Sequence, residues 1–172
     1  MSDYRRALFP GGCYFFTVVT YQRQPLFSCP DNIAHLRAAF KKIKKQRPFC
    51  IDGIVILPDH IHTLWRLPEG DDDFSGRWRE LKKLTSKEIN KQSNERNERH
   101  VWQRRFYEHV IRGETDWQRH MDYIHYNPVK HGLVERVVDW PWSSFHHGVQ
   151  KGRYEVDWGA RVSQTLLSME FE

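Results

Sequence analysis

The sequence predicts an α+β sandwich, in which an antiparallel sheet carries helices packed on one face. Segments rich in β-branched and aromatic residues alternate with segments of helical periodicity, in the order strand–helix–strand–strand–helix–strand–helix. The chain has 172 residues and 39% of them are hydrophobic, which is enough for one domain with a substantial core. Seven Trp, seven Tyr and ten Phe exclude a disordered chain. We therefore expect residues 1–172 to form a single domain.

The first half of the chain predicts three strands and a helix. Residues 13–20 (CYFFTVVT) indicate a central strand. Asp31 can cap the helix that follows. Four apolar residues share one face of this helix: Ile33, Leu36, Phe40 and Ile43. Residues 49–57 and 60–67 flank Pro58-Asp59 and predict a hairpin.

The second half predicts two helices and a short strand. We expect helices over about 75–92 and 114–127, and a strand within 101–112. Residues 93–100 are polar without periodicity and indicate a loop, and Pro128 should end or kink the last helix. Beyond about residue 135 the chain is aromatic and irregular, as expected of a tail packed on the body.

The charge of the chain favours a polyanionic partner. The formal net charge is +5 and the pI about 9.2, which suits nucleic acid before membrane. From residue 32 to 51 there is no acid, while Lys41, Lys44 and Lys45 belong to a run of basic residues on the predicted helix. A soluble basic protein with an ordinary solvated helix face remains the alternative.

The cysteines and the apolar runs of the sequence also predict where in the cell the protein lies. Cys13, Cys29 and Cys50 are widely spaced and odd in number, so we expect buried thiols in a reducing cytoplasm rather than a disulfide framework. No apolar run approaches the roughly 18 residues of a membrane span, and the first residues do not resemble a signal peptide.

Two histidines open the second strand of the predicted hairpin, in the stretch LPDHIHTLW (57–65). Side chains at i and i+2 of a strand point to the same face. His60 and His62 can therefore converge on one metal ion or one phosphate. A pair of histidines on a solvated face is the alternative reading.

The helix predicted over 114–127 carries a second candidate group. Trp117, Met121 and Ile124 form its apolar stripe, and about a quarter-turn away lies a polar one. That polar stripe comprises Asp116, His120, Tyr123 and Asn127. Taken alone, Tyr123 could be a residue at the edge of the core and Asn127 a helix cap before proline.

Together these residues carry a resemblance. HIH at 60–62 followed by DYIHYNPVKHGLV at 122–134 resembles the single-tyrosine HUH transposases, and most of all the REP-associated tyrosine transposases. Further similarity covers most of the chain: YRR (4–6), GGCYFFTV (11–18), LPDHIH (57–62), residues 67–82, WQRRFYEHVIR (102–112) and DWPWSSF (139–145).

The resemblance implies a ferredoxin-like core and a metal-dependent transesterase. It implies that His60, His62 and Asn127 hold a divalent metal, Mg²⁺ or Mn²⁺, and that Tyr123 is the nucleophile. The expected reaction cleaves and rejoins single-stranded DNA at palindromic hairpins through a 5′-phosphotyrosine, which needs no ATP and fits the absence of a GxxxxGK[ST] loop.

Several expectations are less specific. His120, one turn before Tyr123, is a candidate proton acceptor. The resemblance places DNA reading near Tyr4, Arg5 and Arg6, and Lys41, Lys44 and Lys45 are further candidates for DNA contact. We expect a bacterial, nucleoid-associated monomer, with a dimer left open. The alternatives are a non-catalytic DNA-binding protein with a decayed site and a nuclease that uses water.

Overall fold

The structure is a computed structural model and describes residues 8–92, 100–160 and 164–171. Its strands are β1 Cys13–Val19, β2 Cys50–Ile56, β3 His60–Arg66 and β4 Tyr107–Val110. Its α-helices are α1 Pro30–Gln46, α2 Phe74–Gln92, α3 Glu114–Lys130, α4 Phe145–Gln150 and α5 Gln164–Ser168. Short 3-10 helices occur at η1 Tyr21–Arg23, η2 Leu26–Ser28 and η3 Val137–Asp139. The predicted strands and long helices are all present.

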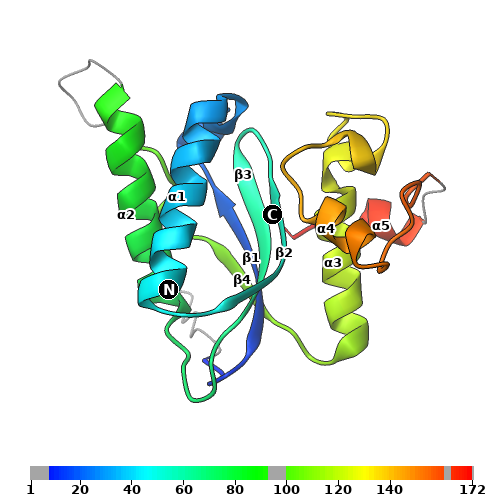
Figure 1. The fold of residues 1–172 in the computed structure, drawn as a ribbon, viewed down its shortest axis with the longest axis horizontal. Coiled ribbons are helices and arrows are strands. Elements are labelled where there is room, and N and C mark those ends of the chain that lie inside the picture. The colour runs from blue at the N-terminus through cyan, green and yellow to red at the C-terminus, as the bar shows by residue number, and fades with distance from the viewer. Residues whose placement is uncertain (1–7, 93–99, 161–163, 172) are drawn as a thin grey trace, which may run out of the picture.

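The four strands and the first two α-helices follow a β–α–β–β–α–β order, and the strands form one antiparallel sheet with the order β2-β3-β1-β4. This is the split β–α–β arrangement of ferredoxin-like folds. Helices α1 and α2 lie side by side over one face of the sheet (Figure 1). The predicted fold class is therefore confirmed.

The sheet is buried on both faces because α3 lies on the side opposite α1 and α2 (Figure 1). Alternate residues of β1 divide between the two layers. Tyr14 and Phe16 pack with α1 and α2, whereas Phe15 packs with α3. On β3, Leu64 faces α3 and Trp65 faces the other helices. The third helix thus adds a layer to the ferredoxin-like sandwich.

Two glycines position α3. Gly53 lies at an irregularity in the pairing of β2 with β3, and a Cβ there would stand 2.5 Å from the Met121 sulfur. Its missing side chain lets α3 approach the sheet closely. Only three residues join β4 to α3, and the last of them, Gly113, has φ +100°, a value that L side chains rarely adopt. This short link turns α3 back over its own sheet.

The helix termini differ from prediction at two positions. The N-cap of α1 is Cys29, and Pro30 occupies the first turn, where its fixed φ suits a helix start. Asp31 is therefore not the cap; it lies inside the first turn, where its charge favours the helix dipole. Pro128 does not end α3, which continues to Lys130 and stops before Gly132 with φ +68°. A proline in the last turn removes a single backbone bond, so the helix tolerates it.

The prediction of buried thiols is wrong for two of the three cysteines. Cys29 and Cys50 are exposed, and Cys13 is half-buried. Cys29 caps α1 and Cys50 opens the edge strand β2, so both lie at the ends of elements rather than in the core.

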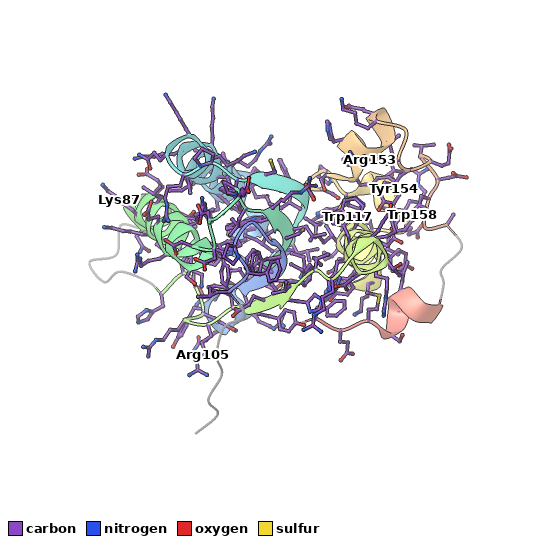
Figure 2. All side chains as sticks on the ribbon, turned by 90° about the horizontal axis from the view of Figure 1, so that it is seen from below. Lys87, Arg105, Trp117, Arg153, Tyr154 and Trp158 are labelled. Atoms are coloured by element: carbon purple, nitrogen blue, oxygen red, sulfur yellow. The ribbon has the colours of Figure 1, made fainter. Side chains whose placement is uncertain are left out.

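The chain beyond residue 135 is more regular than predicted, because η3, α4 and α5 lie within it. It packs against α3: Tyr154 and Trp158 lie beside that helix and pack with its Tyr126 (Figure 2). The chain also extends the sheet edge, since Ser143 bridges Val55 of β2. Most of the polar segment 93–100 lies outside the described residues, and no described helix is long and apolar enough to cross a membrane.

Candidate active site

The two histidines of β3 lie inside the molecule, in the layer between the sheet and α3. His60 is 2% exposed and His62 is fully buried. Their ring centroids are 4.7 Å apart. Because residues i and i+2 of a strand point to the same face, both imidazoles lie side by side, as the sequence predicts. Their burial excludes the alternative of a solvated strand face.

Hydrogen bonds donated by Nδ1 orient both histidine rings. Nδ1 of His62 lies 2.8 Å from Thr17 Oγ1, and that hydroxyl donates its own proton to the Phe171 carbonyl at 2.5 Å. The hydroxyl must then accept from His62, so Nδ1 carries the proton and Nε2 the lone pair. Nδ1 of His60 lies 2.6 Å from Asp59 Oδ1, which selects the same tautomer.

The charges around the pair keep it suited to binding a cation. Burial lowers the pKa of His62 well below its ordinary value, so its ring is neutral at pH 7. Burial alone would raise the pKa of Asp59, but the hydrogen bond from His60 and the Arg23 guanidinium at 3.2 Å outweigh it and lower this pKa to about 2. Asp59 is thus a carboxylate that holds His60 in place.

Helix α3 brings Tyr123 and Asn127 to the histidines. The Tyr123 ring centroid lies 5.1 Å from that of His62, and the two side chains at i and i+4 share one helix face. Asn127 is fully buried, and neither its amide oxygen nor its amide nitrogen has a hydrogen-bond partner among the described residues. Nε2 of His62 is also buried and also has no hydrogen-bond partner in the described part of the chain.

These groups fit a divalent cation. Buried polar atoms without partners are costly, and a site of this kind needs a ligand to satisfy them. The candidate donors are Nε2 of His60, Nε2 of His62 and the amide oxygen of Asn127. Mn²⁺, Mg²⁺ and Zn²⁺ all accept ligands of these kinds. Three protein donors also leave coordination positions open.

A second group of donors lies between β4 and the first turns of α3. His109, Asp116 and His120 offer ligand atoms that lie within 4.8 Å of one another. Here the Asp116 carboxylate is already engaged, at 2.9 Å from His109 Nε2 and 3.1 Å from His120 Nδ1. The bond to His109 ties α3 to β4. Nδ1 of His120 also lies 2.8 Å from the Asp116 main-chain carbonyl oxygen, and this bond orients the His120 ring. Burial lowers the pKa of His120, although its bonds to Asp116 oppose the shift.

The end of the described chain covers the site. The Phe171 ring lies 5.0 Å from Tyr123 and 4.5 Å from His120, measured between centroids. Lys130, one turn after Asn127, donates to the Met169 carbonyl, and its Nζ lies 5.1 Å from the Tyr123 ring centroid. Residues 169–171 are therefore packed against the tyrosine.

The other predicted residues lie elsewhere. Lys41, Lys44 and Lys45 are exposed on α1, across the sheet from Tyr123. Tyr4, Arg5 and Arg6 lie outside the described residues. Sequence reasoning did not identify Thr17 and Asp59. Asp59 could have been found from its place next to His60, whereas Thr17 becomes visible only through the pairing of β1 with β3, in which it lies opposite His62.

The antiparallel core with a histidine pair facing a helix-borne tyrosine defines a class of enzyme. The model of the family described as "Transposase IS200 like" matches residues 12–127. The chain belongs to this family and is a transposase.

Individual relatives agree with this class. A REP-associated tyrosine transposase of Escherichia coli (strain K12) is 46% identical over 164 residues, which cover 95% of this chain and 94% of the relative. A homologue from Haemophilus influenzae is also 46% identical, over 92% of this chain and 94% of its own length. A solved structure described as a REP-associated tyrosine transposase bound to a REP hairpin superposes with a TM-score of 0.84 at 46% identity, covering 95% of this chain and 94% of the other.

Proposed function

We propose that this transposase cleaves and rejoins single-stranded DNA at REP-like palindromic hairpins through a covalent link to Tyr123. The observation that carries the proposal is the position of Tyr123, whose ring lies 5.1 Å from that of the buried His62. The relatives support the substrate, because one of them was solved with a REP hairpin bound. The basic surface suits the same partner.

The proposed reaction is an exchange of phosphodiester bonds. The Tyr123 phenol oxygen forms a bond to the scissile phosphorus, and the bond from phosphorus to the 3′ oxygen breaks. The phenol loses its proton and the leaving 3′ oxygen gains one, which yields a 5′-phosphotyrosine and a free 3′-hydroxyl. Attack by a 3′-hydroxyl reverses the exchange and joins strands, so bond energy is conserved.

We propose that His60, His62 and Asn127 hold a divalent metal, Mg²⁺ or Mn²⁺. A cation bound there supplies Lewis-acid chemistry to a phosphate oxygen. Nε2 of His62 and the amide of Asn127, which have no hydrogen-bond partner among the described residues, support this set. The group of His109, Asp116 and His120 is the weaker candidate, because its carboxylate is already bonded to His109 Nε2 and to the Arg112 main-chain N–H.

His120 is the proposed proton acceptor for Tyr123. Nδ1 of His120 is held by Asp116, so Nε2 carries the lone pair, and the lowered pKa keeps the ring neutral at pH 7. His120→Ala should slow adduct formation by about tenfold to a hundredfold and remove the acidic limb of the pH profile. Equal profiles for variant and wild type would leave deprotonation to another group.

We further propose that residues 1–172 act as one catalytic domain, in the bacterial cytoplasm and in association with the nucleoid where the DNA lies. A monomer suffices, because one copy brings together the histidines, Tyr123 and Asn127. Tyr4, Arg5 and Arg6 are proposed to read the DNA, with Lys41, Lys44 and Lys45 as additional groups that bind phosphate.

Tyr123→Phe tests the proposal directly. The wild type, mixed with a single strand that bears a REP-type hairpin and with Mn²⁺, should give a protein–DNA adduct on a denaturing gel. Tyr123→Phe should give no adduct and no cleavage, yet bind the hairpin nearly as well, because only one hydroxyl is lost. Tyr126→Phe is the matched control, since Tyr126 packs beside Val137 and Trp158, away from the histidines.

Two outcomes would favour the alternatives. Cleavage by Tyr123→Phe at the wild-type rate would indicate a nuclease that uses water. Tight hairpin binding without cleavage by the wild type, with Mn²⁺ or Mg²⁺ present, would indicate a non-catalytic DNA-binding protein.

A further inference from the structure

Lys130 is a cation close to Tyr123 to which the proposed reaction assigns no role. It lies in the last turn of α3, three residues after Asn127 and seven after Tyr123, so it continues the helix face that carries both. Its side chain is half-buried and its Nζ lies 5.1 Å from the Tyr123 ring centroid. Its position is thus set by the same helix that presents the nucleophile.

No acid among the described residues neutralises the charge of Lys130. Within the described chain no carboxylate forms an ion pair with it, and its hydrogen-bond acceptor is the main-chain carbonyl oxygen of Met169. An ammonium group has three N–H donors and prefers anionic oxygen. A partly buried lysine that faces a reacting centre without an acidic partner is suited to an anionic ligand.

The Tyr123 ring lies between Lys130 and the histidines in distance. Lys130 Nζ is 5.1 Å from the Tyr123 ring centroid, and that centroid is 5.1 Å from the centroid of the His62 ring. A phosphodiester under attack by Tyr123 would have to lie beside this tyrosine, and therefore near the Lys130 ammonium.

The terminal segment shows what this space accepts. Lys130 binds the Met169 carbonyl oxygen, and Thr17, the partner of His62, binds the Phe171 carbonyl oxygen. Two acceptor oxygens two residues apart thus lie against two donors on opposite sides of the site. The non-bridging oxygens of a phosphate are stronger acceptors of the same kind.

We propose that the Lys130 ammonium binds a non-bridging oxygen of the scissile phosphodiester, in the place that the Met169 carbonyl oxygen holds in this structure. This inference rests on the proposed function. As Tyr123 attacks, charge develops on that oxygen, and Lys130 stabilises it while remaining protonated throughout. Lys130 is then a catalytic residue, and the phenol and 3′-oxygen protons move as already described.

The test compares rates on charged and neutral linkages. Lys130→Met, Lys130→Arg and the wild type are mixed with a REP-type hairpin strand and Mn²⁺, and single-turnover adduct formation is measured. One substrate has a normal phosphodiester at the cleavage site, and two others carry a stereopure methylphosphonate there. Each methylphosphonate isomer replaces one non-bridging oxygen with a methyl group. Lys151→Met, at the exposed end of α4, is the matched control.

On the phosphodiester, Lys130→Met should be slower by about a hundredfold, as for loss of a group that stabilises the transition state. Its hairpin affinity should stay within about threefold of the wild type, Lys130→Arg should retain much of the rate, and Lys151→Met all of it. On one methylphosphonate isomer, wild type and Lys130→Met should be equally slow, because the oxygen that Lys130 binds is absent.

Other results would overturn the inference. Wild-type rates for Lys130→Met on the phosphodiester would do so while leaving the proposed function intact, provided that Tyr123→Phe is inactive. An equal loss on all three substrates would show that Lys130 acts through the packing of α3 and not on the phosphate. A wild type that forms no adduct on the phosphodiester would remove the proposed function and this inference together.

Discussion

Thr17 acts on the site through two hydrogen bonds. It accepts the Nδ1 proton of His62 and donates to Phe171. Thr17→Val keeps the shape of the side chain but removes the acceptor, so His62 loses the bond that fixes its ring. We expect Mn²⁺ affinity to fall by about tenfold to a hundredfold, as for loss of a group that orients a ligand. Isothermal titration calorimetry measures this directly.

A control separates this effect from loss of a buried hydroxyl in general. Thr85 is also fully buried, and its hydroxyl bonds to Leu81 within α2. Thr85→Val should leave Mn²⁺ affinity unchanged. If Thr17→Val binds Mn²⁺ as tightly as the wild type, the His62 ring is held by packing alone.

For single residues, spacing along the chain explains which members of the site can be predicted. His60 and His62 follow from the two-residue period of a strand, and Tyr123 and Asn127 from the helical repeat. Their juxtaposition depends on docking of α3 against the sheet, for which the sequence offers no local signal beyond Gly53. The role of Thr17 depends on strand register, which spacing along the chain does not reveal.

Helix α3 is held against its surroundings by a buried histidine that must stay neutral. His125 is 1% exposed, its Nε2 lies 3.0 Å from Ser144 Oγ, and burial, aided by His146, lowers its pKa to about 3. The unfolded chain binds a proton at this ring below about pH 6.5, whereas the folded chain does not until about pH 3. The free energy of unfolding therefore falls as pH drops through this window, by up to about 1.4 kcal/mol per pH unit.

His125→Gln removes this titration while an amide can still bond Ser144. Between about pH 6.5 and pH 5 the wild type should lose about 2 kcal/mol more stability than the variant. Urea unfolding at both pH values measures the difference. His62 and His120 add to the loss in both proteins, since their pKa values are also lowered. Identical losses in the two proteins would mean that His125 is protonated in the folded state.

At the level of elements, periodicity predicts existence and type better than boundaries. The apolar stripe on 30–46 and the strand pattern of 13–19 are strong signals because both faces of the sheet are buried. Pro128 does not act as a terminator because the tertiary packing of α3 outweighs one missing backbone bond. The short helices beyond residue 135 carry too few residues for a periodic signal.

The whole molecule presents its basic helix α1 and the helix α3 that carries Tyr123 on opposite sides of one sheet (Figure 1). If Lys41, Lys44 and Lys45 bind the phosphates of a hairpin, replacing all three with Glu should weaken binding. The slope of log affinity against log salt should become shallower by about 0.7 to 0.9 for each phosphate that the protein no longer neutralises. Binding titrations over a range of salt concentrations measure both effects.

The distance of α1 from Tyr123 sharpens this test. At saturating DNA, adduct formation by the triple variant should proceed at the wild-type rate, because no group of the site has changed. Lys151→Glu, just after the end of α4, serves as the control for added negative charge. An unchanged affinity and salt slope would make the α1 surface an ordinary solvated face.

The three-residue link before α3 has a consequence for how copies of the chain relate to one another. Gly113 adopts a φ of +100°, and this turn returns α3 to the sheet that precedes it. A residue with a Cβ disfavours that turn. A helix that could not return would meet the same sheet surface only on a second copy, in a domain-swapped pair whose sites each combine histidines from one chain with the tyrosine of the other. The left-handed turn at Gly113 thus lets one chain bring its own Tyr123 to its own His62.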